Sequence, residues 1–254
     1  FRPAGYYEVE AGADAAGVLT AWDFGCYNAG TAALESPYKV DNARTRYYTC
    51  ASPMREGSYR GIAATANTFV REGAMEELAY ACGVDPLTFR LRNCANPRLR
   101  AVLEEAADKF GYAKRRGQHK GIGIAGGTEK GSYVAACAEV REGKLTEIHL
   151  VFECGAILNP SNLKAQVEGS IIQGLGGALT EAMEFSGGKL LNGSFAKYRM
   201  PRMAGLPKIE ITLLDRRDLE PAGAGETPII AVAPAIASAL YQADAAPRRQ
   251  LPLL

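Results

Sequence analysis

Residues 133–183 read YVAACAEVREGKLTEIHLVFECGAILNPSNLKAQVEGSIIQGLGGALTEAM and contain the pattern that decides the fold class. Two apolar runs, Tyr133–Val140 and Leu145–Phe152, flank a polar turn, which predicts a β-hairpin. A long helix is expected to follow from Pro160 to Met183, with Asn159 as its N-cap and the proline in its first turn. Because a hairpin and then a helix depart from regular strand–helix–strand alternation, the sequence predicts an α+β fold.

The remainder of the chain shows the same irregular mixture of elements. Residues 6–28 predict another hairpin, in which Val18, Thr20, Trp22 and Phe24 share one face of the second strand. The other expected elements are strands at 45–50 and 208–214, a loop at 52–65, and helices at 67–82, from 85 onward, through 99–110 and over 227–242. We therefore expect mixed sheets with packed helices.

Length and composition place the chain among globular proteins. Its 254 residues suffice for one large domain or two smaller ones, and the charged segment 114–118 is the expected linker between residues 1–116 and 117–254. Hydrophobic residues make up 47% and charged residues 22%, which is ordinary for globular proteins. The net charge of +1 gives no reason to expect nucleic acid or an anionic membrane as a partner. No apolar stretch approaches the roughly 18 residues of a membrane span.

The six cysteines form no C-x-x-C pair, and the chain has only two histidines. Zinc and iron–sulfur sites need clustered Cys or His ligands, so neither is expected in this chain. Reduced thiols of a cytoplasmic-type protein are favoured over a disulfide framework. The first residues, Phe1-Arg2-Pro3, lack a start methionine and a signal-peptide layout, which is typical of a cut inside a longer polypeptide or of a processed subunit.

The turn Gly223-Ala224-Gly225-Glu226-Thr227-Pro228 places a carboxylate at the edge of the apolar run Ile229–Leu240. Because its neighbours are almost all apolar, Glu226 is expected to have few local partners. Apolar surroundings destabilise the charged form of a carboxylate, which suits proton transfer near neutral pH. The glycines let the backbone turn sharply and let a bulky ligand approach. The alternative is that Glu226 only caps the helix that follows.

The helix expected over 160–183 has an unusual interior. Four glycines interrupt it, at Gly169, Gly174, Gly176 and Gly177. Each costs about 1 kcal/mol relative to Ala, which is tolerated where another backbone or a flat ligand comes into contact. Gln166, Ser170 and Gln173 form a polar stripe beside them. Such amides suit the donor and acceptor edge of a heterocycle, and the alternative is a helix packed on a sheet with a solvated Gln face.

Two loops are open to more than one interpretation. In the loop 55–61, Arg60 suits a carboxylate or carbonyl of a substrate, or is a surface charge. The segment Gly121–Gly127 is rich in glycine, but it lacks the preceding strand and the following acidic residue of a dinucleotide-binding fingerprint. We expect it to be a flexible edge before a strand, and a nucleotide-binding domain is the rival interpretation.

Together and in this order, these segments resemble the molybdenum hydroxylases, the family of xanthine dehydrogenase, aldehyde oxidase and isoquinoline 1-oxidoreductase. The chain looks like the C-terminal half of their large, molybdopterin-binding subunit over nearly its whole length. The matching segments are Ser58-Tyr59-Arg60-Gly61, Ala74-Met75-Glu76-Glu77-Leu78-Ala79, Gly83-Val84-Asp85-Pro86, Phe89-Arg90-Leu91-Arg92-Asn93, Gly131-Ser132-Tyr133-Val134-Ala135, Cys154-Gly155, Asn159-Pro160, Gln166-Val167-Glu168-Gly169 and Gly225-Glu226. The short path from 131–135 to 159–160 is most similar to the isoquinoline 1-oxidoreductase beta chain.

The resemblance implies an oxidoreductase that hydroxylates an aldehyde or an N-heteroaromatic substrate with oxygen from water. In such enzymes a glutamate in a Gly-Glu motif accepts the proton of the molybdenum-bound hydroxyl, a role that maps onto Glu226. The cofactor's dithiolene holds the molybdenum, so no side chain of this chain is expected as a metal ligand. The other residues carried over are the cofactor-binding Gln166, Gly225 and Gly61 and the substrate-proximal Tyr59 and Arg60.

The resemblance also implies a cofactor and partners. The cofactor would be molybdopterin in its cytosine dinucleotide form, with no iron–sulfur cluster or flavin in this chain. The partners would be a [2Fe-2S] small subunit, the N-terminal half of the large subunit, a small-molecule substrate and a flavin or cytochrome electron acceptor. Residues 1–116 and 117–254 would belong to two molybdopterin-binding subdomains, the second carrying the Gly-Glu motif. A cytoplasmic location is expected, with the periplasm as the alternative.

Two features depart from the family pattern. The upstream Gly-Gln-Gly segment that grips the cofactor from the other side is absent from these 254 residues. The alternative function is therefore a non-catalytic or cofactor-free fragment that keeps the fold and a partner-binding surface. In addition, Gly57 stands where carbon monoxide dehydrogenases carry a cysteine, which argues against a copper–molybdenum site.

Overall fold

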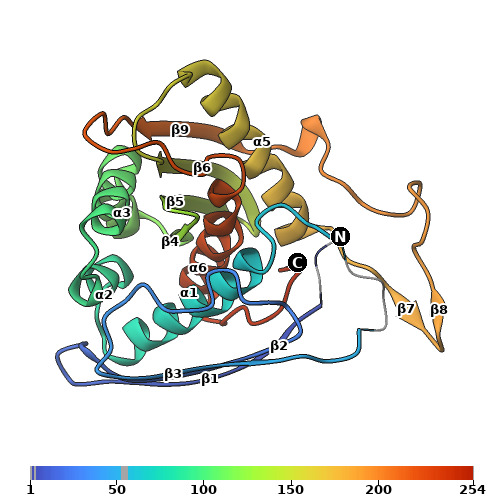
Figure 1. Ribbon diagram of the computed structural model, residues 1–254, viewed down its shortest axis with the longest axis horizontal. Coiled ribbons are helices and arrows are strands. Elements are labelled where there is room, and N and C mark those ends of the chain that lie inside the picture. The colour runs from blue at the N-terminus through green and yellow to red at the C-terminus, as the bar shows by residue number, and fades with distance from the viewer. Residues whose placement is uncertain (1, 3, 53–56, 254) are drawn as a thin grey trace.

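The structure, a computed structural model, describes residues 2, 4–52 and 57–253, and the first part of the loop 55–61 lies outside this range. The predicted α+β class is confirmed, because helices and sheets mix without a repeating strand–helix–strand unit (Figure 1). None of the helices in the described residues is long and apolar enough to cross a membrane.

A four-stranded sheet forms the centre of the fold. Its order is β4 (Ile122–Glu129), β5 (Ser132–Arg141), β6 (Lys144–Glu153) and β9 (Lys208–Leu214). The first three strands form an antiparallel meander, and β9 joins parallel to β6. The hairpin predicted from the opening stretch is therefore confirmed as β5–β6.

Both faces of this sheet are covered by helices, as Figure 1 shows. Ala135 and Cys137 of β5 join the core formed with α3 (Pro97–Phe110). Ala136 and Ala138 point to the other side, into the core formed with α5 (Pro160–Leu179) and α6 (Val232–Asp244). Burial on both faces explains why β5 reads as an almost continuous apolar run rather than an alternating one.

The glycine-rich segment before β5 is itself the buried strand β4, so the expectation of a flexible edge there is wrong. A Cβ added to Gly123 would collide with backbone atoms of Ala235 and Ala239 in α6. A Cβ on Gly126 would meet Leu103 of α3 at 2.9 Å. The glycines therefore let helices lie directly against the strand, which the strand-propensity signal alone does not reveal.

A second sheet contains β1 (Tyr6–Ala13), β2 (Leu19–Tyr27) and β3 (Asn42–Tyr48) in that order, with β3 parallel to β2. The predicted hairpin is confirmed, but the shared face is only partly correct. The register shifts between Gly12 and Ala13, so that β2 carries a bulge at Thr20. Trp22 and Phe24 are consequently buried, whereas Val18 is exposed.

Helices α1 (Ala64–Ala81) and α2 (Pro86–Asn93) connect the two sheets. Asp85 is the N-cap of α2, since its side chain accepts from two backbone N–H groups of the first turn. The buried Arg90 of α2 contacts two buried carboxylates of α1, Glu72 at 2.8 Å and Glu76 at 2.9 Å. This ion cluster ties the two helices together in the core.

The expected charged linker is instead the helix α4 (Tyr112–Gln118). Arg115 lies 3.0 Å from Glu147 of β6 and 3.3 Å from Glu139 of β5. Arg116 donates to the Ile122 carbonyl at 2.8 Å. Its arginines thus bind the central sheet, which is why the segment is ordered. The division into residues 1–116 and 117–254 stays a prediction.

The chain between α5 and β9 forms an arm. Helix α5 ends at Leu179, four positions before the predicted end, and the short hairpin β7 (Phe185–Ser186) and β8 (Lys189–Leu190) follows. Figure 1 shows this hairpin, in orange, standing away from the central sheet. A 3₁₀ turn at Met203–Gly205 leads back to β9.

The predicted C-terminal helix begins with the 3₁₀ turn η2 (Thr227–Ala231) and continues as α6, with Pro234 in the first turn of α6.

Candidate functional site

Arg60 brings together three segments that are far apart in the sequence. Its Nε donates to the Gly225 carbonyl oxygen at 2.6 Å. Its Nη2 donates to the Gln166 side-chain oxygen at 2.7 Å and to the Gln166 carbonyl oxygen at 3.1 Å. The loop before α1, the start of α5 and the turn before η2 therefore meet at one guanidinium group.

Local backbone geometry positions Arg60. Gly61 has a φ of +77°, a conformation that favours glycine. A Cβ at this position would lie 2.7 Å from a methyl group of Ile229 in η2. The glycine thus lets the loop press against the turn that carries Glu226, which directs Arg60 across to Gly225.

Glu226 lies next to this junction and differs from its predicted surroundings in two ways. Its side chain makes no capping hydrogen bond to η2, so the capping interpretation is wrong. Instead, the Lys130 ammonium contacts the Glu226 carboxylate, and the two side chains are 45% and 35% exposed. This partner is distant in the sequence, as the expectation of few local partners requires, but the carboxylate is paired with a cation and partly exposed, and is not enclosed by apolar side chains. The hydrogen bond to Glu226 raises the pKa of Lys130 above its usual range.

The sequence did not indicate Lys130 as a partner of Glu226, because the two residues are 96 positions apart. It occupies the two-residue turn between β4 and β5, directly before the family-like segment 131–135. The sequence offered no signal for it, because the segment before Tyr133 was not expected to be a strand and no local pattern indicates which distant carboxylate a turn lysine contacts.

Tyr59 is buried, and its hydroxyl makes no hydrogen bond of normal geometry within the described residues, although the Gln173 side chain of α5 is near enough to lower its pKa slightly. Burial raises the pKa of this phenol. The hydroxyl lies beside Gly177 of α5, where an added Cβ would be 3.2 Å away. Tyr59 therefore faces α5, whereas its neighbour Arg60 faces the Gly225 turn.

The polar stripe on α5 is divided between two environments. Gln166 is exposed and is held by Arg60, while Ser170 is buried and donates to the Gly225 carbonyl at 3.5 Å. Gln173 is half-buried. A Cβ on Gly174 would lie 2.9 Å from Val232, so this glycine serves close packing against the start of α6. At Gly174, the interpretation of the α5 glycines as sites of close packing therefore fits the structure.

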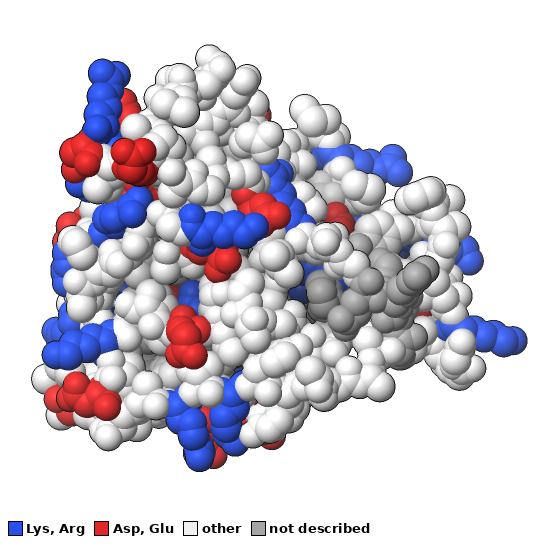
Figure 2. All heavy atoms as spheres, viewed as in Figure 1, with Lys and Arg blue, Asp and Glu red and all other residues white. Residues whose placement is uncertain are grey.

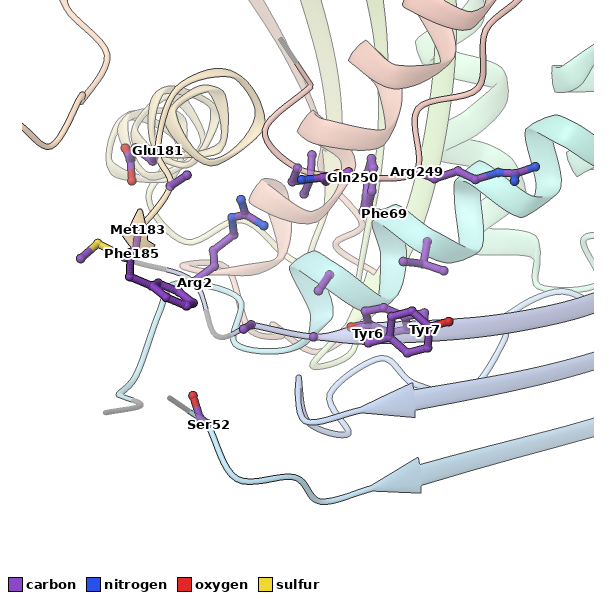
Figure 3. Close-up of a pocket in the computed structure, with 16 residues that line it drawn as sticks. Arg2, Tyr6, Tyr7, Ser52, Phe69, Glu181, Met183, Phe185, Arg249 and Gln250 are labelled. Carbon is purple, nitrogen blue, oxygen red and sulfur yellow. The ribbon is translucent and has the colours of Figure 1, made fainter. Parts of the chain in front are cut away.

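A cavity of about 590 Å³ lies between β1, α1 and the segment after α5, at some distance along α5 from Gln166. Figure 3 shows Arg2 among the lining side chains, together with Phe69 and Glu181. Arg2 donates to the Gly177 carbonyl at 2.8 Å. Burial lowers the pKa of this guanidinium, and nearby Tyr59 opposes that effect. Sequence reasoning assigned no role to Arg2.

Charged side chains of both signs lie on the face of the molecule drawn in Figure 2. On the face drawn in Figure 2, basic and acidic side chains alternate over the part of the chain that the structure describes. The described residues contain no group of three or more His, Cys, Asp or Glu that could hold a metal ion. All six cysteines are free.

Two family models match the chain in order, over residues 1–94 and 130–207, and both are described as molybdopterin cofactor-binding domains. Together they cover more than half of its length. This chain belongs to the molybdopterin cofactor-binding domain family. The resemblance to the molybdenum hydroxylases is thereby confirmed. The Arg60 junction joins residues inside both matched regions, since Arg60 lies in the first and Gln166 in the second.

Curated relatives carry consistent names. The chain is 26% identical over 241 residues to a nicotinate dehydrogenase subunit of Pseudomonas putida, covering 85% of this chain and 20% of that protein. It is 29% identical over 204 residues to the isoquinoline 1-oxidoreductase beta chain of Brevundimonas diminuta, covering 76% of this chain and 26% of that protein. This member of the molybdopterin cofactor-binding domain family therefore spans about a quarter or less of the length of these relatives.

Solved structures confirm the fold. The aldehyde oxidoreductase of Desulfovibrio gigas superposes with a TM-score of 0.85 at 15% identity, covering 99% of this chain and 48% of that one. The quinoline 2-oxidoreductase of Pseudomonas putida 86 gives a TM-score of 0.79 at 14% identity, covering 95% and 59%. At these identities the likeness establishes the architecture of this molybdopterin-binding chain.

Proposed function

We propose that this chain forms part of the molybdopterin-binding subunit of an oxidoreductase that hydroxylates an aldehyde or an N-heteroaromatic compound with oxygen from water. The observation that carries the proposal is the junction at Arg60, because it joins the Gln166 and Gly225-Glu226 segments across 106 and 165 positions of sequence. The names of the relatives, among them nicotinate dehydrogenase and isoquinoline 1-oxidoreductase, support this class of substrate.

The residues at the junction fit a pterin cofactor. Arg60 donates a hydrogen bond to the side-chain oxygen of Gln166. The Gln166 amide nitrogen makes no hydrogen bond within the described residues, so it is an exposed donor. Gly225 presents no side chain beside it, and the atom nearest to an added Cβ is the Gln166 oxygen at 4.0 Å. We infer that Gln166, Gly225 and Gly61 lie along the cofactor. Tyr59 and Arg60 lie near the substrate in this proposal.

Glu226 is the proposed general base. When bound, molybdopterin supplies the metal centre that takes up two electrons and activates an oxygen derived from water. The chain itself supplies a carboxylate that is 35% exposed on a turn, within reach of a bound ligand. A carboxylate in this position accepts the proton released as the substrate is hydroxylated, and such proton transfer contributes about 10²- to 10⁴-fold to a rate.

The proposal includes further partners. We infer that the cofactor is the cytosine dinucleotide form and that electrons leave to a [2Fe-2S] small subunit and then to a flavin or cytochrome acceptor, in the cytoplasm. The remaining cofactor contacts come from the N-terminal half of the large subunit. We propose that this N-terminal half docks on a surface that includes the arm between α5 and β9, where Phe195 is 100% exposed and Met203 83% exposed.

The direct test is Glu226→Gln in the molybdenum-loaded enzyme that contains this chain. We expect unchanged molybdenum content and a turnover number reduced by about 10²-fold or more, because the amide cannot accept a proton. Glu220→Gln, an exposed residue in the same loop, is the control and should leave both values unchanged. Normal turnover in Glu226→Gln would contradict the base assignment. An absence of molybdenum from the wild-type chain together with its partner polypeptides would favour a non-catalytic fragment.

A further inference from the structure

The loop that carries Glu226 is held by the turn between β4 and β5. The Thr227 hydroxyl donates to the Glu129 carbonyl at 2.9 Å, and the Gly223 N–H donates to the Lys130 carbonyl at 3.3 Å. The Ser132 hydroxyl donates to the Gly223 carbonyl. These contacts fix the backbone on both sides of Glu226, but none of them reaches its carboxylate.

The Lys130 side chain does reach it. Among the described residues, Lys130 provides the cation in ion-pair contact with Glu226. The neighbouring Arg60 is engaged by Gly225 and Gln166 instead, at distances of 2.6 to 3.1 Å. Glu129 is the other nearby charged group, and burial raises the pKa of its carboxyl more than the attraction of Lys130 lowers it.

The turn itself does not require a lysine. Lys130 has a φ of +52° and Gly131 a φ of +76°, so both central residues of the two-residue turn adopt a conformation that favours Gly or Asn. For a residue with a Cβ and no local side-chain hydrogen bond, this conformation costs about 1–2 kcal/mol. A lysine at this position therefore costs stability, and its ammonium group offers the compensating contact.

We propose that Lys130 is a positioning residue for Glu226, which orients the carboxylate toward the ligand that the site binds. This inference rests on the proposed function of Glu226 as the base. The direct contact between the ammonium and the carboxylate restricts the directions in which the Glu226 side chain can point. Lys130 thus prepares Glu226 for proton transfer without touching the substrate.

Two substitutions separate this role from turn stability. Lys130→Asn removes the cation and suits the turn, so we expect unchanged or higher thermal stability together with kcat reduced by about tenfold and KM within about twofold. Lys130→Arg keeps a cation and should restore most of kcat. Lys109→Met is the matched control, because Lys109 forms a comparable exposed pair with Glu105, at 50% and 33% exposure, on α3.

A second measurement needs no cofactor. NMR of the chain with isotope-labelled lysine should show that the pKa of the Lys130 ammonium lies above the usual range for lysine, because of its hydrogen bond to Glu226, and Glu226→Gln should remove this shift. Identical titration of Lys130 with and without Glu226 would overturn the pairing. Wild-type kcat in Lys130→Asn, with Glu226→Gln inactive, would overturn the positioning role and leave the proposed function intact. Full activity of Glu226→Gln would instead refute the proposed function, whatever the titration shows.

Discussion

At the scale of single residues, one guanidinium group organises the candidate site. Arg60 makes three hydrogen bonds that join the Gly225 turn to the first turns of α5. The sequence identified the residue types at this junction, because each belongs to a motif of recognisable composition. It did not identify Lys130 as the partner of Glu226, because contacts between distant positions follow from the fold and not from local pattern.

Substitution of Arg60 tests whether the junction requires its planar guanidinium group or only its charge. Arg60→Lys keeps the positive charge, but a single ammonium group cannot donate hydrogen bonds to both Gly225 and Gln166 as the guanidinium group does. Hydrogen bonds to charged groups contribute about 1.5–3 kcal/mol, so we expect molybdenum content or kcat/KM to fall by about tenfold or more. Metal analysis and steady-state kinetics measure the two quantities. Arg44→Lys, at an exposed pair with Asp23, is the control, and equal losses in both variants would argue against a special role for Arg60.

At the scale of elements, sequence periodicity predicted the hairpins and the long helices well. The hairpin β5–β6 and the start of α5 follow directly from the apolar pattern and from Asn159, which caps the helix through its side chain. The errors have physical causes. A bulge at Thr20 changed which residues share the buried face of β2, and long-range ion pairs of Arg115 ordered a segment whose composition suggests a linker.

The glycines of β4 give a test at this scale. Gly123→Ala would force a methyl group into the backbone of α6, and overpacking of this kind costs about 1–3 kcal/mol of folding free energy. Gly73→Ala in α1 is the matched control, since nothing lies within 4 Å of the added methyl group. It should stabilise the protein by about 0.5–1 kcal/mol. Urea unfolding of both variants measures the difference, and a neutral Gly123→Ala would show that α6 does not pack against β4 as described.

At the scale of the whole molecule, the fold is shared with proteins of which this chain covers only a part. It spans 20% of the nicotinate dehydrogenase subunit and 26% of the isoquinoline 1-oxidoreductase subunit. The resemblance implied the C-terminal half of a large subunit, whereas the aligned share of these two relatives is about a quarter or less. Substrate shape does not follow from this sequence in the same way, because in the proposed function the N-terminal half of the large subunit contributes side chains to the site.

The exposed arm allows a test of whether the N-terminal half of the large subunit binds there. Changing Phe195 and Met203 together to Ser should weaken binding to the separately produced N-terminal half of the large subunit by about tenfold or more, since exposed apolar side chains are frequent binding anchors. The unfolding temperature of the chain should not change, because both side chains are exposed. Calorimetric titration measures the affinity. Val18→Ser, an exposed change on the first hairpin, is the control, and unaltered binding by the arm variant would place the interface elsewhere.

In the proposed function, Glu226 serves as the base beside a cofactor held at the Arg60 junction. The most direct measurement is the rate at which substrate reduces the bound molybdenum in a single turnover, compared between wild type and Glu226→Gln at equal metal content. We expect a reduction rate at least about 10²-fold lower in the variant, with bound molybdenum unchanged, because the amide cannot accept the proton. Equal reduction rates in the two proteins would contradict it.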